Sequence, residues 1–144
     1  MDYTIKKMKE NNKINILGCV PALLNVLFEL TEESIGIKSF LILKNIPIES
    51  NNLFTHLDSW DVEFINYFET TRSFNQNDFF ALSVVGTTSK KYVYDYFKEK
   101  IKMDNKQFIN LIHPTSYISK SVKLDYALQI EPLSTISACT TIGF

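Results

Sequence analysis

The sequence lacks the features that would point to a membrane, a metal or a nucleic acid. No apolar run approaches the roughly 20 residues of a membrane span, and the polar N-terminus has no signal-peptide core. The two cysteines, Cys19 and Cys139, lie far apart and form no metal-ligand pattern. The net charge is −1, so no general attraction to nucleic acid or to an anionic membrane is expected. We therefore predict a protein of the reducing cytoplasm, without a metal, a nucleic-acid partner or a membrane span.

Length and composition favour one globular domain with a small appendage. The chain has 144 residues, of which 45% are hydrophobic and 22% are charged, as is usual for a protein with an ordinary core. Eleven phenylalanines and seven tyrosines give that core bulk. We predict a polar leader at 1–12, a main domain at 13–112 and an appendage at 113–144.

Strand and helix patterns alternate along the main domain. Strands are expected at 13–20, 39–46, 61–68, 79–86 and 108–112. Helices are expected from Pro21, which suits a first helical turn, and after a capping Thr or Ser near residue 87. The alternation favours an α/β fold in which helices cover both faces of a parallel sheet. Such sheets bind ligands outside the carboxyl ends of their strands, and Gly18 and Gly86 end two of these strands.

A different period begins at the end of this domain. Aliphatic residues recur every six positions, at Ile112, Ile118, Leu124, Ile130, Ile136 and Ile142. A period of six fits neither a helix nor a simple strand. It fits a chain that turns a corner every six residues, so that three flat sides make one coil. A second inward position is aliphatic or small at Val122, Leu128, Ser134 and Thr140. We predict the first coils of a parallel β-helix built from hexapeptide repeats; the alternative is an irregular tail with two edge strands.

The junction between the two patterns carries a family resemblance. The stretch "NLIHPTSYISKSVKLDYALQIEPLSTISACTTIGF" resembles that of sugar O-/N-acyltransferases similar to sialic acid O-acetyltransferase (NeuD-like) and bacillosamine N-acetyltransferase (PglD-like). There, a Rossmann-like domain runs through an entry of the form I-H-P-[ST]-A-x-I-S into a left-handed parallel β-helix. The entry is matched by Ile112, His113, Pro114, Thr115, Ile118 and Ser119. The resemblance implies a nucleotide-linked sugar in the N-terminal domain and acetyl-CoA between the β-helices of a homotrimer.

The family's general base is a β-helix histidine in coils that this chain does not contain. The resemblance therefore places no catalytic residue here, and whether the chain is an enzyme stays open. Its two histidines are His56, expected on a surface loop, and His113, expected to have a structural role at the junction. Since the chain holds fewer than two full coils, and about three repeat units are needed to bury a continuous core, we do not expect it to transfer an acyl group by itself.

The expected substrate site departs from the family at the first turn. The family has a glycine-rich turn, G-x-G-G-H, where this chain has Gly18, Cys19, Val20 and Pro21. Pro21 removes an amide donor and Val20 adds bulk, although the helix dipole still favours an anion. Cys19 is expected to be buried and inert, although a helix N-terminus can lower the pKa of a thiol.

Three further residues complete the predicted substrate site. Lys44 ends the second strand, where it either meets a phosphate or lies on the surface. Gly86 and Thr87 form the second loop that faces the ligand, or serve only as a helix cap.

Three functions remain open on these grounds. The first is the substrate-binding part of an acetyl-CoA-dependent sugar acyltransferase, in the synthesis of surface polysaccharide or glycan. The second is a non-catalytic binding or assembly module that has lost nucleotide binding. The third, a nicotinamide-dependent enzyme, is disfavoured because G-x-G-x-x-G and a suitably placed acidic residue are both missing.

Overall fold

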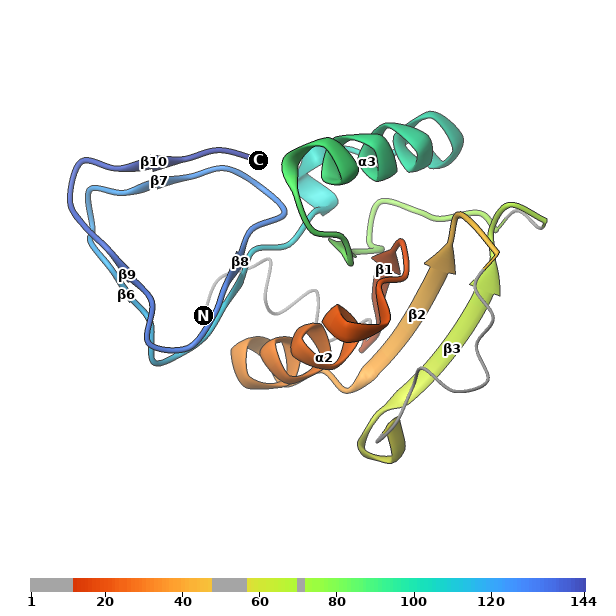
Figure 1. Ribbon diagram of the computed structural model, residues 1–144, viewed down its shortest axis with the longest axis horizontal. Coiled ribbons are helices and arrows are strands. Elements are labelled where there is room, and N and C mark those ends of the chain that lie inside the picture. Colours follow the sequence, from red (N-terminus) through yellow and green to blue (C-terminus); the bar gives the residue numbers. More distant parts are fainter. Residues whose placement is uncertain (1–11, 48–56, 70–71) are drawn as a thin grey trace.

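A four-stranded parallel sheet forms the centre of the main domain. The computed structural model of the chain describes residues 12–47, 57–69 and 72–144. The strands are β1 (Ile14–Leu17), β2 (Ser39–Lys44), β3 (Asp61–Asn66) and β4 (Phe80–Leu82). Their spatial order is β3-β2-β1-β4, so the chain extends the sheet to one side of β1 and then returns to place β4 on the other side (Figure 1). The order reverses between β1 and β4.

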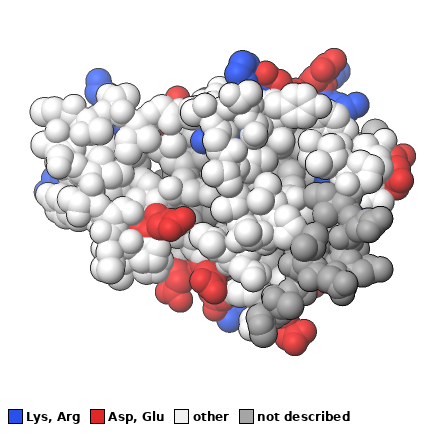
Figure 2. All heavy atoms as spheres, viewed as in Figure 1, with Lys and Arg blue, Asp and Glu red and all other residues white. Residues whose placement is uncertain are grey.

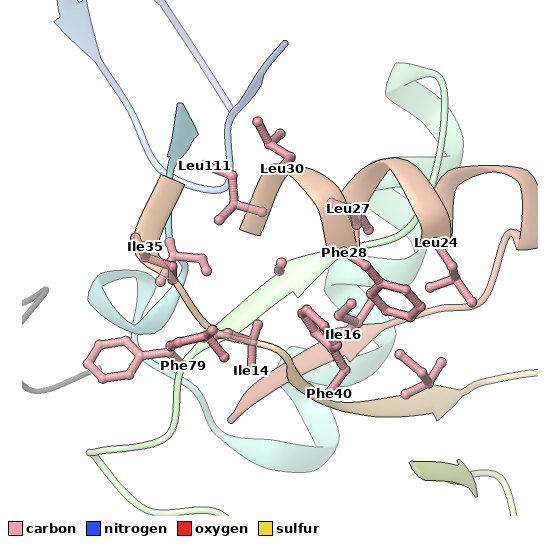
Figure 3. Packing of buried hydrophobic residues seen from close by; sticks show 14 of the residues in the cluster. Ile14, Ile16, Leu24, Leu27, Phe28, Leu30, Ile35, Phe40, Phe79 and Leu111 are labelled. Carbon is pink, nitrogen blue, oxygen red and sulfur yellow. The ribbon is translucent and has the colours of Figure 1, made fainter. Parts of the chain in front are cut away.

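Two helices cover the two faces of this sheet. Helix α2 (Pro21–Ile35) packs on one face, where Phe28 stacks on Phe40 with their ring centroids 4.3 Å apart (Figure 3). Helix α3 (Thr87–Ile101) packs on the other face, where Phe97 lies in a cluster with Leu17 and Leu43. Successive strand residues supply opposite faces, which explains why these strands read as continuous apolar runs. The predicted α/β fold with helices on both faces is confirmed.

A glycine with positive φ stands at one end of each of these two helices, and no side chain caps the start of either. Helix α2 starts at Pro21 as predicted and ends at Gly36, which has a φ of 76° and donates its N–H to Glu32 O at 2.8 Å. Gly86, with a φ of 82°, precedes α3, and no side chain bonds to the start of that helix. The predicted Thr or Ser cap is therefore wrong, and Thr87 is the first helical residue.

All five predicted strands are shorter in the structure than expected, and the last also has an unexpected partner. Only Phe80–Leu82 of the predicted strand 79–86 pairs with β1 as β4, and the residues after it lead through Gly86 into α3. Within 108–112, only Leu111–Ile112 is a strand, β5, and it pairs with a later segment of the chain and not with the sheet. Phe108 makes just an isolated bridge to Phe80. The sheet accordingly has four strands among the described residues.

The C-terminal segment folds as a triangular coil. Strand β5 pairs with β8 (Gln129–Ile130), β6 (Tyr117–Ile118) with β9 (Thr135–Ile136), and β7 (Lys123–Leu124) with β10 (Thr141–Ile142). All three pairs are parallel, and Figure 1 shows the two turns of chain lying one on the other around a triangular outline. Each repeated aliphatic is the second residue of its strand, and from β6 to β10 it is less exposed than the residue before it; in β5 the order is reversed, since Leu111 is buried and Ile112 is partly exposed. These residues thus form a coil of six-residue sides, and the irregular tail is wrong; that the coil is the start of a β-helix stays a prediction.

The corners of the coil use an unusual backbone conformation. Ala127, Leu133 and Cys139 have φ values of 56°, 60° and 60°, a left-handed region that costs non-glycine residues energy. Hydroxyl groups of the first turn support two of these corners. Thr115 Oγ1 accepts from Leu133 N at 3.1 Å, and Ser121 Oγ accepts from Cys139 N at 3.0 Å. These bonds satisfy amides that the strained corners leave outside the strand pairing.

The coil is joined to the sheet along the free edge of β4. Ile109 N donates to Phe80 O at 3.0 Å, and Gln129 Nε2 donates to Leu82 O at 2.6 Å. Leu111 enters the apolar cluster beneath α2, on the side of Leu30 (Figure 3). These contacts leave the edge strand protected from pairing with other chains. The division of the chain at 12/13 and 112/113 stays a prediction.

Replacing Leu133 by glycine should stabilise the coil. The side chain is 82% exposed, so its loss removes little packing, whereas glycine adopts a φ of 60° without the steric cost. We expect L133G to raise the free energy of unfolding by about 0.5–1 kcal/mol, measured by urea denaturation.

Ala138 supplies the matched control, because it is also exposed and is not among the residues with positive φ. A138G should lower the free energy of unfolding, since glycine loses more backbone entropy there. Destabilisation by L133G would contradict the proposed corner strain.

Candidate functional site

The strand order reverses between β1 and β4. Open parallel sheets bind ligands outside the carboxyl ends of their strands at such a reversal. Here these ends are followed by the turn Gly18–Pro21 after β1 and by Ser83–Gly86 after β4. Gly18 has a φ of 81°, and a Cβ there would lie 3.2 Å from Val84 and 3.3 Å from Val93. Both the backbone and the packing therefore favour glycine at this turn.

The amides of the first turn are largely committed to protein acceptors. Gly18 N donates to Leu43 O at 3.0 Å, and Val20 N donates to Ser83 Oγ at 3.2 Å. Pro21 has no N–H, and Leu23 N donates to Val20 O at 2.9 Å. A glycine-rich turn binds phosphate through such free amides. The sequence "GCVP", which departs from a glycine-rich turn, therefore leaves few free amide donors at this helix N-terminus.

Ser83 is a contributor that the sequence analysis missed. It is fully buried, and its hydroxyl bridges from the end of β4 to the turn after β1. A polar residue inside the apolar run "FFALSVVG" was the available signal, since a buried hydroxyl needs a hydrogen-bond partner.

Lys44 lies at the end of β2 and is only 8% exposed. The alternative that Lys44 lies on the surface is therefore wrong, and its contact with a phosphate stays a prediction. Its backbone carbonyl accepts from Tyr67 N at 2.9 Å. In the described parts of the chain, no carboxylate forms an ion pair with its ammonium group.

Cys19 lies in the apolar cluster on the α2 face and is 6% exposed. Burial raises the pKa of its thiol to about 11, and the positive charge of Lys44 only partly opposes this. Desolvation thus outweighs any effect of the helix N-terminus. The prediction of a buried cysteine is confirmed.

Gly86 and Thr87 line a hollow of about 650 Å³ between α3 and the coil, together with Lys90, Tyr94, Tyr126 and Phe144. Tyr126 and Phe144 stack with centroids 4.9 Å apart. Lys90 Nζ donates to Ala127 O at 3.2 Å and lies 4.5 Å from the centre of the Phe144 ring. Burial lowers the pKa of Lys90, and Asp125 opposes that effect. The hollow combines aromatic faces with a cation. No sequence pattern indicated it, because its residues meet only through the packing of the coil.

A second hollow, of about 250 Å³, lies between α2 and the coil and has the opposite character. Glu29, Glu33 and Glu131 line it together with His113. Figure 2 shows acidic side chains gathered around this end of α2. Like charges repel, so this hollow does not suit a phosphate-bearing ligand. The carboxyl edge of the sheet is the better candidate.

The ring of His113 is fixed by the corner that follows it. Its Nδ1 accepts from Thr115 N at 3.2 Å and lies 2.8 Å from Thr115 Oγ1. A nitrogen that accepts from a backbone amide has a free lone pair, which assigns the proton of the neutral ring to Nε2. In that state His113 donates at Nε2 and does not act as a base there, in agreement with the predicted structural role.

Two of the predictions concern residues outside the described parts of the chain. His56 and residues 1–11 of the leader lie outside the described residues. Within 12–47, 57–69 and 72–144, no group of three or more His, Cys, Asp or Glu side chains is placed to hold a metal ion. None of the helices described there is long and apolar enough to cross a membrane.

Comparisons with known proteins give a likeness in fold. No family model matches the sequence, and no curated protein matches it significantly. Among solved structures, the chain is similar to PerB from Caulobacter crescentus, which was crystallised in complex with CoA and GDP-perosamine. The TM-score is 0.59 at 17% sequence identity, over 91% of this chain and 56% of PerB. The chain thus spans little more than half the length of PerB, and at this identity the likeness concerns the fold.

Substituting Gly18 should destabilise the protein more than substituting Gly36. Both have positive φ, but a Cβ at Gly36 meets nothing within 4 Å. G36A therefore measures the backbone cost alone, about 1–2 kcal/mol, and G18A adds the crowding by Val84 and Val93. We expect a further loss of about 1 kcal/mol in the free energy of unfolding, measured by urea denaturation. Equal losses would show that the turn at Gly18 has room for a side chain.

The native protein should react with a thiol reagent at one of its two cysteines. Cys139 is exposed and Cys19 is buried. With a pKa of about 11, only about one thousandth of Cys19 would be thiolate at pH 8, and the thiolate is the reactive form. We expect Ellman's reagent to titrate one thiol, and C139S to abolish that signal. A second thiol that reacts rapidly in the folded C139S protein would contradict the burial of Cys19.

Proposed function

We propose that this chain is the substrate-binding N-terminal part of an acetyl-CoA-dependent acyltransferase that acts on a nucleotide-linked sugar. Residues 13–112 would form its Rossmann-like domain, and residues 113–144 the first coils of a left-handed parallel β-helix. One observation carries the proposal: a parallel sheet whose strand order reverses between β1 and β4 is joined directly to a coil of six-residue sides. The similarity in fold to PerB, which was crystallised with CoA and GDP-perosamine, supports it.

The nucleotide-linked sugar would lie across the carboxyl edge of the sheet. The turn formed by Gly18, Cys19, Val20 and Pro21 would border it on one side, together with Lys44. Gly86 and Thr87 would border it on the other side, where the hollow beside Lys90 is cationic and aromatic. Charged and ring-bearing parts of a nucleotide suit such surroundings.

The coil stands close enough to this edge to share the substrate. Gln129, which belongs to β8, bonds to the last residue of β4, and Lys90 of α3 bonds to Ala127 of the coil. A sugar attached to a nucleotide at this edge could therefore extend along the coil. Acetyl-CoA bound to further coils would approach the sugar from the side of the coil. The arrangement therefore supports acyl transfer on that side.

Acyl transfer needs a nucleophile, a donor and a group that accepts a proton. The amine or hydroxyl of the sugar attacks the thioester carbon of acetyl-CoA, the C–S bond breaks, and the attacking group loses its proton to a base. We assign no base among the described residues, because His113 carries its proton on Nε2. The base and most of the acetyl-CoA site would belong to further coils, within a homotrimer in the cytoplasm.

A second candidate is a non-catalytic binding or assembly module. The observation in its favour is the commitment of the Gly18 and Val20 amides to Leu43 and Ser83. A turn with few free donors holds phosphate less well. Nucleotide binding distinguishes the two candidates.

Titration calorimetry with GDP-, UDP- and dTDP-linked amino sugars tests the proposal. We expect saturable binding of at least one of them, and none of the corresponding free sugar or of NADH. Lys90→Met should weaken that binding, whereas Lys123→Met, which removes an exposed lysine of the coil, should not. If the folded protein binds no nucleotide-linked sugar, the assembly module is the better reading.

A further inference from the structure

Lys44 is a buried cation without a counter-ion among the described residues. It is more than nine-tenths buried, and neither a salt bridge nor a side-chain hydrogen bond joins it to residues 12–47, 57–69 or 72–144. Lysines that are this buried are normally paired, because removing a charge from water is costly. Ser34 Oγ is the one fully enclosed side-chain atom that lacks a partner in this part of the chain. The ammonium of Lys44 therefore keeps some contact with solvent.

The side chain of Lys44 points toward the first turn of α2. Residues two apart on a strand share a face, and Ile42 belongs to the cluster on the α2 face. Cys19, just before α2, lies close enough to Lys44 for its charge to affect the thiol. Burial raises the pKa of the thiol, and the positive charge of Lys44 opposes that rise. The ammonium thus lies beside the turn after β1, at the ligand edge of the sheet.

The turn Gly18–Pro21 has few free amide donors, and the positive charge of Lys44 lies beside it. Gly18 N and Val20 N are committed, and Pro21 has none. An ammonium group beside a helix N-terminus attracts an anion by charge.

We propose that Lys44, with the turn Gly18–Pro21, forms a phosphate site that takes the diphosphate of a nucleotide. The assignment of a nucleotide as the source rests on the proposed function; the anion site itself does not.

The test compares Lys44→Met with wild type, using inorganic diphosphate as the first probe and a nucleotide-linked sugar as the second. Methionine keeps the apolar stem and removes the charge. Lys123→Met removes an equal charge from the exposed face of the coil, and Lys44→Arg retains the charge. Melting temperature and titration calorimetry are recorded for each variant with and without each probe.

We expect diphosphate to raise the melting temperature of wild type and of K123M, and to leave K44M unchanged. Affinity for diphosphate should fall about tenfold or more in K44M and be largely kept in K44R. Without ligand, K44M should melt no lower than wild type, because an unpaired buried cation has been removed. A purely structural lysine would show the reverse, with a lower melting temperature and an unchanged response to diphosphate.

Each outcome separates this inference from the proposed function. Equal diphosphate affinity in wild type and K44M overturns the Lys44 site, even if nucleotide-linked sugars bind. Diphosphate binding that depends on Lys44, without any binding of nucleotide-linked sugars, supports the anion site and overturns the proposed function. Failure of wild type to bind either probe overturns both.

Discussion

The exposed edge of β4 is the constraint on which the arrangement of the molecule depends. An edge strand leaves peptide groups without partners, and a folded protein must pair or cover them. Ile109 and Gln129 do so here, with bonds to Phe80 O and Leu82 O. The same two bonds fix where the coil begins and bring β8 to the carboxyl end of β4. Closing the sheet therefore also places the coil beside the carboxyl edge of the sheet.

The coil solves a different problem, that of turning a corner every six residues. Leu133 and Cys139 adopt left-handed backbone conformations, and hydroxyl groups one full turn earlier bond to their amides. Each turn of the coil thus depends on the side chains of the turn before it. Among the six repeated aliphatics Ile130 is buried and the others stay partly exposed, because two turns cover each other on one side only. This is the physical reason why repeat folds need several units.

The residues of the turn after β1 determine which amide donors and charges lie at the carboxyl edge of the sheet. With Val20 and Pro21 in the first turn, free amides give way to a hydrogen bond with Ser83. The buried Lys44 adds positive charge at the same edge. The proposed anion site would therefore rely on a side-chain cation in place of a cradle of peptide groups, and such a cation acts as a point charge without fixed geometry.

The sequence by itself determined the parallel α/β pattern and the six-residue coil, because each is a local periodicity of apolar residues. It also determined the start of α2, because Pro21 suits the first turn of a helix. It also indicated Gly18, which directly follows β1, whereas β4 ends at Leu82 and Gly86 instead precedes α3. Only the tertiary structure decided that Lys44 is buried, that β5 pairs with the coil, and that Gln129 and Lys90 join the coil to the sheet. These depend on contacts between residues far apart in the chain, and no local pattern records which distant group a side chain will meet.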